Sequence, residues 1–403
     1  MILKREDYLE KITPLIGKNI IKVLTGIRRC GKSIILSQIV EEVKNRGIKD
    51  ENILFINFDS SNFQNIFDNN DLNLFVSDYI MDKDQKYFLF FDEIQNVKDW
   101  QLSISSFLVD YNVDIYITGS NANLLSGELA TLLTGRHIEF KIYPFSFKEI
   151  ISYNKLNGIN LDTNAVFNRY IKFGGMPFTL ELDDDNKVRY LEDLQKSIIF
   201  NDVLKRVSIN NIDLLERLIR FTMNNVGQIF SANSISKYFK SENRSVKSET
   251  IYNYLKYLEN ACFIHKVHRK DLVGKKILKF NEKFFLTDFG FREAMFGSNM
   301  KDIGQILENI VYLELLRRGY KVNVGKLYQS EVDFVAQKGS DKLYIQVTYL
   351  MADEKTRERE FKPLTKINDA YPKYVLSMDP IDYEYEGIKK INIIDFLLNK
   401  DKY

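Results

Sequence analysis

One segment of eight residues, 26–33, constrains this sequence more than any other part of it. It reads GIRRCGKS and fits the pattern G-x-x-x-x-G-K-[ST]. The apolar, β-branched stretch at 19–25 predicts a strand before it, and residues 34–40 repeat apolar side chains at helical spacing after it. Strand, glycine loop and helix is the context in which this pattern forms a phosphate-binding loop. The chain is therefore expected to bind a nucleoside triphosphate.

The residues of this loop have separate expected roles. Glycines let backbone N–H groups close around the phosphates, and the helix N-terminus adds its dipole. Lys32 is expected to reach the β- and γ-phosphates, and the Ser33 hydroxyl to bind Mg²⁺. Arg28 and Arg29 either neutralise phosphate charge or point into solvent, and both interpretations stay open. The residues expected to contact ATP here are Gly26, Arg28, Arg29, Cys30, Gly31, Lys32, Ser33 and Ile34.

A second apolar stretch ends in two acids. Residues 87–91 read YFLFF and continue into Asp92 and Glu93. A continuous apolar run is typical of a strand buried on both faces of a parallel sheet, and such sheets bind ligands at the carboxyl ends of their strands. We expect Asp92 to hold Mg²⁺ and Glu93 to orient and polarise the attacking water. ATP hydrolysis is therefore the expected reaction, with Glu93 and Lys32 as catalytic residues.

Two further positions follow along the chain. The strand expected at 113–119 ends in Ser120 and Asn121, which either hydrogen-bond the γ-phosphate or attacking water, as sensor 1 residues do, or cap the next helix. Arg136 precedes another expected strand. Arg136 is either a surface residue or a group whose guanidinium stabilises charge on the γ-phosphate of a neighbouring subunit. The second interpretation implies a homo-oligomer, and both stay open.

Composition excludes several other classes of protein. With 403 residues the chain is too long for one core, so two or three domains are expected. The net charge of +2 leaves any basic surface for nucleic acid to a local cluster. Two cysteines predict a reducing, cytoplasmic setting. Charged residues near Met1 argue against a signal peptide, and no apolar stretch reaches the roughly 20 residues of a membrane span.

These motifs together resemble those of a known family. The order GIRRCGKS, FLFFDEIQNVKDW, YITGSNANLLSGEL, LTGR, YPFSFKE and GGMP is similar to prokaryotic AAA-type ATPases with a DUF4143 C-terminal region. The resemblance covers essentially the whole chain and implies an AAA+ core that binds and hydrolyses ATP, while it leaves the biological role open. The nucleotide site carried over from the family comprises Gly31, Lys32, Ser33, Asp92 and Glu93.

The expected fold class is α/β, with four domains along the chain. An AAA+ P-loop domain with a parallel sheet is followed by a helical lid, a winged-helix domain and a small restriction-endonuclease-like domain. The expected boundaries are 1–145, 146–225, 226–298 and 299–403.

The winged-helix expectation rests on two short helices, at 231–239 and 247–258, followed by a hairpin. The second helix of this arrangement often enters a major groove of DNA. A local group of basic residues favours DNA as a partner, whereas the other interpretation is a protein scaffold with solvated lysines. The group comprises Lys240, Arg244, Lys247, Lys256, Lys266, Arg269, Lys270, Lys275 and Lys276.

The last segment resembles the PD-(D/E)xK nuclease core. Glu308, on an expected helix, and Asp333, on an expected strand, match two of the acids with which that core binds Mg²⁺. Its Glu-x-Lys position is instead occupied by Gln346 and Thr348, which supply neither the carboxylate nor the lysine. We therefore expect a degenerate nuclease fold without cleavage activity, and DNA binding by it stays open.

Three functions are consistent with these motifs. The leading hypothesis is an ATPase whose nucleotide state moves C-terminal domains that act on DNA or on a protein partner. The second is a nucleotide-gated signalling or binding module that hydrolyses ATP slowly or not at all. The third is an ATP-dependent nuclease, against which Gln346 and Thr348 argue.

Overall fold

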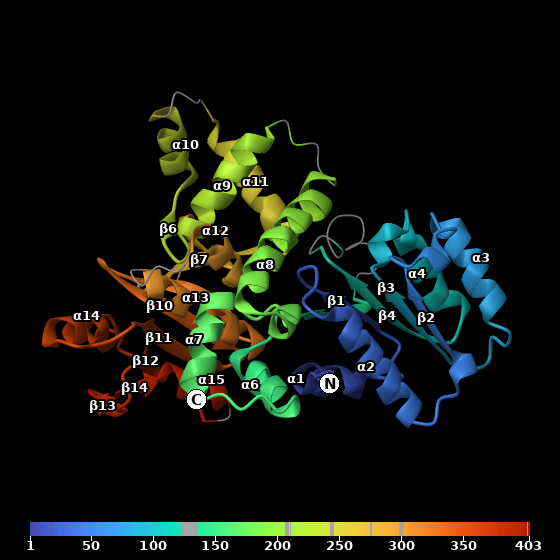
Figure 1. Cartoon of the computed structure of the whole chain (residues 1–403), viewed down its shortest axis with the longest axis horizontal. Helices are drawn as coiled ribbons and strands as arrows, with labels where there is room; N and C mark the ends of the chain where they lie inside the picture. Colours follow the sequence, from blue (N-terminus) through green and yellow to red (C-terminus); the bar gives the residue numbers. More distant parts are fainter. Residues whose placement is uncertain are drawn as a thin grey trace. The chain divides into compact units, whose positions relative to one another are not determined.

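The chain forms two compact units (Figure 1). Unit 1 comprises Met1–Pro144 with Asn260–Cys262, and unit 2 comprises Phe145–Glu259 with Phe263–Tyr403. Some residues named in the sequence analysis lie outside the part of the chain that the structure describes. They are residues 122–123 and 125–134 of the motif region, and Arg244 and Lys275 of the basic group. The computed structural model describes residues 1–121, 124, 135–205, 209, 211–241, 246–274, 276–297, 302–400 and 402–403.

Unit 1 is built on a five-stranded sheet in which every pairing is parallel. The strand order is β2-β3-β4-β1-β5, so β4 separates the strand before the phosphate loop from the strand that ends in Asp92. All the carboxyl ends meet at one edge, where open parallel sheets bind ligands. The predicted α/β fold with a parallel sheet is confirmed. The strands are β1 (Ile21–Thr25), β2 (Ile53–Asn57), β3 (Tyr87–Asp92), β4 (Val113–Gly119) and β5 (His137–Lys141).

Helices cover both faces of this sheet. Figure 1 shows α3 and α4 on one face and α2 on the other, as right-handed crossovers require. Leu72 and Val76 of α3, Ile104 and Phe107 of α4, and Phe91 of β3 belong to one buried cluster. The described helices of unit 1 are α1 (Glu6–Ile12), α2 (Lys32–Asn45), α3 (Asn69–Tyr79) and α4 (Trp100–Asp110), with 3-10 turns at Thr13–Leu15, Asp50–Asn52, Ser61–Phe63 and Ile94–Asn96.

A buried ion pair joins β1 to β4. The side chains of Lys22 and Asp114 both have 0% exposure, and the Lys22 ammonium contacts the Asp114 carboxylate. The ammonium also donates to the carbonyl oxygen of Lys18 at 2.9 Å. The carboxylate accepts from the backbone N–H of Gly17 at 2.7 Å and from the Tyr116 hydroxyl at 3.0 Å. Burial lowers the pKa of Lys22, although Asp114 acts in the opposite direction. The pair is therefore held by bonds to both of its charged groups.

Unit 2 is organised around a mixed nine-stranded sheet with the order β13-β14-β12-β11-β10-β9-β7-β8-β6. Because β7 pairs with β9 in parallel, the hairpin expected in a winged helix and the strands expected in a nuclease-like domain form one sheet. The boundary expected at 298/299 falls between parts of this sheet, and the division into four domains stays a prediction. The strands are β6 (Ile229–Phe230), β7 (Ile264–Asp271), β8 (Ile277–Leu286), β9 (Lys321–Leu327), β10 (Ser330–Lys338), β11 (Asp341–Val347), β12 (Lys373–Ser377), β13 (Tyr383–Tyr385) and β14 (Ile388–Asn392).

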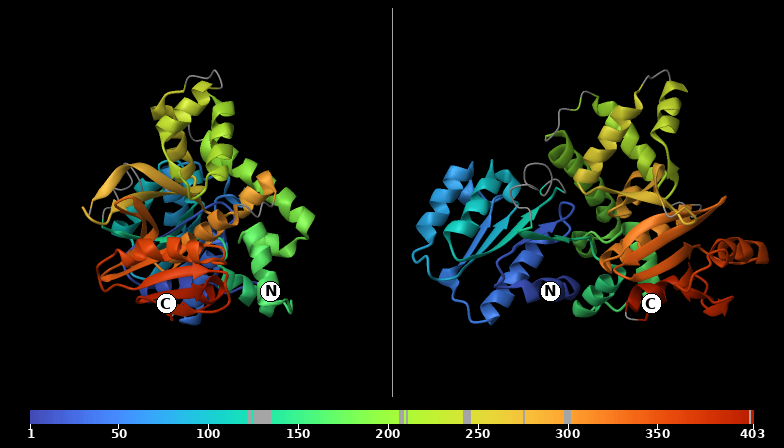
Figure 2. Two further views of the ribbon diagram at one scale, coloured as in Figure 1. Left: turned by 90° about the vertical axis from the view of Figure 1, so that its left-hand side faces the viewer. Right: turned by 180° about the vertical axis from the view of Figure 1, so that it is seen from behind.

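Two successions of helices and strands in unit 2 can be compared with the domains expected from the sequence. The first is α9, β6, α10, α11, β7, β8, and the second is α13, β9, β10, β11, α14, β12. In the second, β9, β10 and β11 are antiparallel and β11 pairs in parallel with β12; these are the orange and red elements of Figure 2. The described helices are α6 (Phe147–Leu156), α7 (Thr163–Phe173), α8 (Asp184–Ile198), α9 (Ile212–Asn224), α10 (Ala232–Ser241), α11 (Ser248–Asn260), α12 (Gly290–Phe296), α13 (Ile303–Arg317), α14 (Glu354–Thr365) and α15 (Ile393–Leu398), with a 3-10 helix at Pro177–Glu181 and a π-helix at Ile199–Leu204. Throughout the described residues, no helix is both long and apolar enough to cross a membrane.

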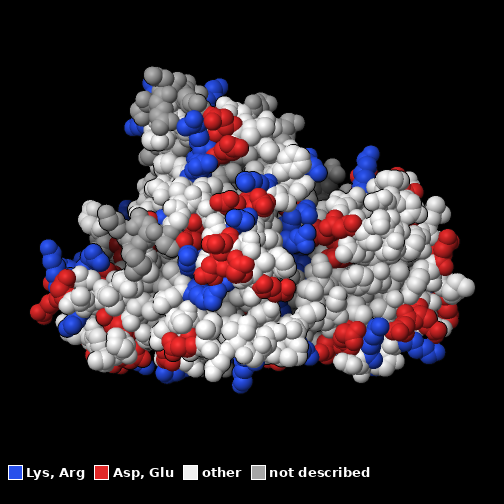
Figure 3. Space-filling view, in the orientation of Figure 1, with Lys and Arg blue, Asp and Glu red and all other residues white. Residues whose placement is uncertain are grey.

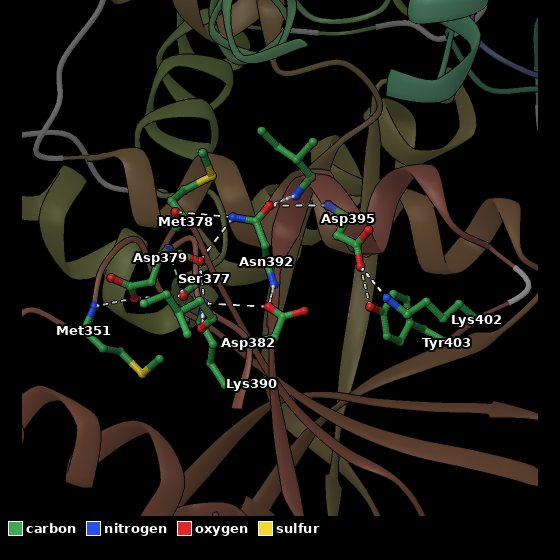
Figure 4. Close-up of polar contacts among 12 residues, drawn as sticks. Met351, Ser377, Met378, Asp379, Asp382, Lys390, Asn392, Asp395, Lys402 and Tyr403 are labelled. Atoms are coloured by element: carbon green, nitrogen blue, oxygen red, sulfur yellow. Dashed lines mark hydrogen bonds and ion pairs between the residues drawn. The ribbon is translucent and has the colours of Figure 1, made fainter. Parts of the chain in front are cut away.

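A network of polar groups lies where strands β12 and β14 end (Figure 4). The Asp379 carboxylate accepts from the backbone N–H of Met351 and from the Ser377 hydroxyl, both at 2.9 Å. Asn392 caps α15 and donates to the carbonyl oxygen of Asp379 at 3.2 Å. The ammonium of the buried Lys390 donates to the same oxygen. These groups bind one another, which indicates a structural role.

The buried carboxyl group of Asp288 connects two segments of unit 2, the turn at Gly175 and the start of α12 at Gly290. Its side chain is only 1% exposed. One oxygen accepts from the backbone N–H of Gly175 and the other from that of Gly290, each at 2.8 Å. Burial raises the pKa of Asp288 to about 7, although these N–H groups and Arg317 of α13 act in the opposite direction. The folded protein therefore holds a proton that the unfolded chain releases at lower pH.

The free energy of unfolding is expected to fall as pH rises from about 4 to about 7, since stabilisation present below the ordinary pKa is lost as Asp288 ionises in the folded state. Urea unfolding of wild type and Asp288→Asn across this interval measures the effect. The substitution is expected to remove about 2–4 kcal/mol of the pH dependence. An unchanged slope in the variant would show that other groups cause it.

Candidate nucleotide-binding site

The phosphate loop lies between β1 and α2, at the carboxyl edge of the parallel sheet. Gly31, with φ of 102°, precedes α2, and Lys32 is the first residue of that helix. Gly26 passes so close to the segment after β5 that a Cβ atom there would lie 2.2 Å from the carbonyl oxygen of Ile142. Only glycine fits this approach. The loop therefore brings backbone N–H groups to a helix N-terminus, which is an anion-binding arrangement.

Lys32 contacts Glu93 across the site. Its Nζ lies 3.4 Å from Oε1 of Glu93, and its side chain is 3% exposed. The same ammonium donates to the carbonyl oxygens of Gly26 and Ile27 at 3.1 and 3.3 Å. Burial alone would lower the pKa of Lys32, but the neighbouring Glu93 carboxylate raises it above its ordinary value. The loop therefore keeps a buried positive charge at the place where phosphates would bind.

Asp92, at the end of β3, has one bonded and one unbonded oxygen. Oδ1 accepts from the Thr118 hydroxyl at 2.5 Å. Oδ2 is buried and has no hydrogen-bond partner among the described residues. Burial raises the pKa of Asp92, while the Thr118 hydroxyl and the nearby Ser33 hydroxyl act in the opposite direction. An unused carboxylate oxygen beside a hydroxyl is a donor set that suits a hard dication, so these residues fit the Mg²⁺ that the family resemblance implies.

Glu93 follows Asp92 in a left-handed conformation, with φ of 54°. Its backbone N–H donates to the Thr118 hydroxyl at 2.9 Å, and its carboxylate accepts from the Gln95 amide. Burial alone would raise the pKa of Glu93, but Lys32 and then Gln95 hold it below its ordinary value. The carboxylate is therefore ionised at neutral pH, as a group that polarises water must be.

Two of these residues were not singled out from the sequence. Thr118 bonds both acids, through Oδ1 of Asp92 and the N–H of Glu93. Gln95 is accommodated because Gly119 has no side chain: a Cβ atom there would lie 2.6 Å from Oε1 of Gln95. A hydroxyl at the end of an otherwise apolar strand was the available signal for Thr118, whereas no local pattern marks Gln95.

The structure places the other predicted residues of the nucleotide site as follows. Ser120 and Asn121 are buried directly after β4, between the loop strand and the strand of Asp92. Cys30 is buried, its thiol donates to the carbonyl oxygen of Ile142 at 3.4 Å, and burial raises the pKa of that thiol. Their contact with a nucleotide stays a prediction.

The remaining loop residues face outward to different degrees. Arg28 is half-buried. Its charge lowers the pKa of Glu93, but less than Lys32 does. Arg29 is exposed, and Ile34 of α2 is 41% exposed. Of the two arginines, Arg28 is therefore the one with an electrostatic influence on the acids of the site.

Arg136 lies at the opposite edge of the sheet. It is exposed and precedes β5, whose first residue pairs with Ile21 at the start of β1. The loop begins after the last residue of β1, about 15 Å away along a strand of this length. Arg136 therefore does not join the site of its own chain, and its role toward a second copy stays a prediction.

Unit 2 contains a second cluster of ionisable side chains, which lines a cavity of about 1200 Å³. The predicted Glu308 and Asp333 both line it. Lys283 of β8, not singled out from the sequence, points into the same cluster, with Nζ 2.7 Å from Glu331 and 3.4 Å from Glu308. Burial raises the pKa of both Glu308 and Asp333.

Gln346 and Glu360 complete this cluster. Oε1 of Gln346 accepts from the backbone N–H of Asp333 at 2.7 Å, and its amide donates to Glu360 of α14 at 3.2 Å. Gln346 thus links Asp333 and Glu360 at the position where the predicted nuclease resemblance calls for a carboxylate. Within the described residues, no group of three or more His, Cys, Asp or Glu side chains is arranged to hold a metal ion.

The fold of unit 1 resembles that of P-loop ATPases. A family model described as an AAA domain matches residues 18–151, and one described as a domain of unknown function (DUF8612) matches residues 164–302. The Walker-type ATPase of Pyrococcus abyssi has a similar fold, with a TM-score of 0.53 at 14% identity over 73% of this chain and 96% of that one.

Two relatives match nearly the whole chain. An uncharacterized protein of Haemophilus influenzae is 38% identical over 398 residues, which are 98% of this chain and 99% of that protein. An uncharacterized protein of Methanocaldococcus jannaschii is 34% identical over 389 residues, 94% of this chain and 85% of that protein. The chain belongs to this family of AAA-domain proteins. The predicted AAA-type family is thus confirmed, whereas the resemblance to DUF4143 proteins stays a prediction.

Proposed function

We propose that this protein is a Mg²⁺-dependent ATPase in which the nucleotide state of unit 1 controls unit 2. The observation that carries the proposal is the placement of Lys32, Asp92 and Glu93 at one edge of the parallel sheet, with Lys32 and Glu93 in contact at 3.4 Å. The AAA domain and the P-loop fold support nucleotide binding and ATPase activity.

The chain's own residues divide the work of hydrolysis. Backbone N–H groups of the loop and the Lys32 ammonium bind and neutralise the β- and γ-phosphates. Ser33 and Asp92 hold Mg²⁺, which supplies neutralisation of the phosphate oxygens. Glu93, kept ionised by Lys32, accepts a hydrogen bond from the attacking water and polarises it. Gln95 fixes the Glu93 carboxylate.

Further residues complete this proposed site. Ser120 and Asn121 hydrogen-bond the γ-phosphate or the attacking water from the end of β4. Arg136 of a second copy neutralises charge on the γ-phosphate, which makes the active form a homo-oligomer. The exposure of Arg136 and its place at the far edge of its own sheet support a role between copies.

Replacement of Lys32 by alanine tests nucleotide binding. Wild type is expected to bind ADP and to hydrolyse ATP, while Lys32→Ala weakens binding by about 30-fold or more, because a charge-assisted contact to phosphate is lost. Isothermal titration and a phosphate-release assay measure the two. Lys44→Ala is the matched control, since Lys44 lies on the same helix but pairs with Asp50 at the surface. Binding without turnover, with and without duplex DNA, would favour the nucleotide-gated module.

DNA is the partner that the exposed lysines of unit 2 support. The element order from α9 to β8 supports the winged-helix prediction for this segment. Four lysines are exposed along it, namely Lys240, Lys247, Lys256 and Lys276. In contrast, Lys266 and Arg269 lie 3.4 and 3.7 Å from Glu282 and Glu331. Figure 3 shows acidic and basic side chains interspersed over α7 and α8, so this face of the two helices is not uniformly basic.

Fluorescence anisotropy with a labelled duplex tests this partner. Binding should weaken steeply with salt, and Lys247→Ala with Lys256→Ala should reduce the slope by about one per phosphate contact removed. Lys196→Ala, which removes an exposed lysine of α8, is the control. No binding at low salt would leave a protein as the partner.

The second element order, α13 to β12, supports a nuclease-like fold without cleavage activity. Lys283 places its ammonium among Glu308 and Glu331, where a metal-dependent nuclease needs a dication, and Gln346 replaces a carboxylate. DNA cleavage that is lost in Asp333→Ala would overturn this assignment and establish an ATP-dependent nuclease.

A further inference from the structure

The segment through which the chain leaves unit 1 is held against the phosphate loop. Residues 142–144 follow β5 and end the unit. The carbonyl oxygen of Ile142 lies where a Cβ atom on Gly26 would be, and it accepts from the Cys30 thiol at 3.4 Å. Residues from both ends of the loop therefore contact this exit segment.

Arg5 bridges the loop and the exit segment. Arg5 is only 1% exposed. Its NH1 group donates to the carbonyl oxygen of Cys30 at 3.1 Å and to that of Tyr143 at 3.0 Å. The guanidinium lies over the ring of Tyr8, 4.7 Å from its centre. The Tyr8 hydroxyl in turn accepts from the backbone N–H of Tyr143 at 3.1 Å. The Arg5 guanidinium and the Tyr8 hydroxyl thus fix the backbone C=O and N–H of Tyr143 relative to the loop.

The next residues of the chain are fixed equally closely inside unit 2. The backbone N–H of Phe145 donates to the carbonyl oxygen of Gly175 at 2.7 Å. Gly175 approaches so closely that a Cβ atom there would lie 2.1 Å from the carbonyl oxygen of Phe145. Its own N–H donates to Asp288, which also accepts from Gly290, the first residue of α12. The Gly-Gly-Met-Pro turn is thus part of a bonded series that reaches α12.

We propose that Arg5 and residues 142–145 form a relay that carries the nucleotide state of the phosphate loop to the 174–177 turn and α12. The relay rests on the proposed nucleotide function. Arg5 is a positioning residue, because it acts through Cys30 and Tyr143.

The physical basis is that Lys32 and Arg5 bind different carbonyl oxygens of the same short loop. Lys32 donates to the carbonyl oxygens of Gly26 and Ile27, and a phosphate competes for that ammonium. The Ile27 carbonyl also accepts from the backbone N–H of Cys30 at 3.3 Å, so a rotation of the Ile27 peptide plane acts on Cys30. The planar Arg5 group ties the Cys30 carbonyl to that of Tyr143. Proline at position 144 leaves little freedom before Phe145. A displacement of Tyr143 is therefore passed to the Phe145 and Gly175 amides.

Hydrogen exchange of the full chain, with and without ADP and Mg²⁺, tests the relay. In wild type, ADP is expected to slow exchange in peptides covering 142–147 and 172–178 by about threefold or more, the change expected when local opening becomes less frequent. In Arg5→Met, ADP binding is expected to weaken by about five- to tenfold, as for loss of buried charge-assisted hydrogen bonds. At saturating ADP the slowing at 172–178 should disappear in this variant.

Three other variants separate a relay from a general loss of stability. Arg5→Lys keeps the positive charge but not the planar guanidinium that binds two carbonyl oxygens, so ADP is expected to slow exchange at 172–178 less than in wild type. Asp288→Asn breaks the far end and should abolish the response at 172–178, with ADP affinity unchanged within about twofold. Arg46→Met is the matched control, since Arg46 also donates to a backbone carbonyl, that of Thr13 at 2.8 Å, but away from the loop. It should respond as wild type does.

The outcomes distinguish the two proposals. If wild type does not bind ADP, the proposed function fails and the relay with it. If wild type binds ADP but exchange at 172–178 is unchanged, the relay alone fails. A full response in Arg5→Met or, should that variant not fold, in Arg5→Lys and Asp288→Asn also overturns it.

Discussion

Glu93→Gln is expected to lower the ATP turnover number by a factor of about 10²–10⁴ while leaving ADP affinity within about threefold of wild type. The amide has nearly the shape of the carboxylate but cannot polarise water as an anion does. Lys32, whose Nζ lies 3.4 Å from Glu93, loses a partner and keeps its bonds to the loop carbonyls. Steady-state phosphate release and titration calorimetry give turnover and affinity separately.

The matched control for this substitution is Glu51→Gln. Glu51 has a side chain that is 69% exposed and pairs with Lys49 at the surface, so its turnover should equal that of wild type. Because Lys32 and Gln95 hold the pKa of Glu93 below its ordinary value, wild-type activity should not decline until pH falls well below neutrality. Wild-type turnover in Glu93→Gln would contradict the assignment of Glu93 as the group that polarises water.

Asp114→Ala is expected to lower the free energy of unfolding by about 3–5 kcal/mol, the cost of leaving a buried charge without its partner. Lys22 is fully buried, and the Asp114 carboxylate also accepts from Gly17 and Tyr116, so one substitution strips partners from three groups. Urea unfolding followed by circular dichroism measures the loss.

Two variants make this second prediction specific. Asp110→Ala removes an exposed acid at the end of α4 and should change stability by less than about 0.5 kcal/mol. The double substitution Lys22→Met with Asp114→Leu replaces the pair by apolar groups and should recover most of the loss. A loss below about 1 kcal/mol in Asp114→Ala would mean that water or a rearrangement satisfies Lys22.

The nucleotide site was predictable where its residues are contiguous. The loop and the Asp92–Glu93 pair each lie next to a strand whose apolar run is visible in the sequence, and the parallel sheet then brings them to one edge. Thr118 and Arg5 act through tertiary contacts, so only the folded chain shows their partners. Gln95 bonds Glu93 two residues away, but no local pattern marks that bond.

In unit 2 the strands and the hairpin of β7 with β8 were predictable, but the pairing of strands far apart in the sequence was not. The pairing of β7 with β9 joins residues far apart in the sequence, and alternation of apolar residues within a strand does not specify its partner. Lys283 comes before the predicted acids in the sequence and Glu360 comes after them. No local sequence pattern therefore indicated that these two charged residues join the cluster.

The continuous sheet also determines which fragments of this protein can be made. Cutting the chain near residue 298 would separate β7 from β9 and leave both fragments with a row of unpaired N–H and C=O groups. Such open edges recruit other strands, so the shorter fragments should aggregate even where their own helices are intact. A fragment that begins at residue 145 keeps every strand pairing of the nine-stranded sheet together with the helices of unit 2, which makes it better suited to expression on its own than a fragment cut near residue 298.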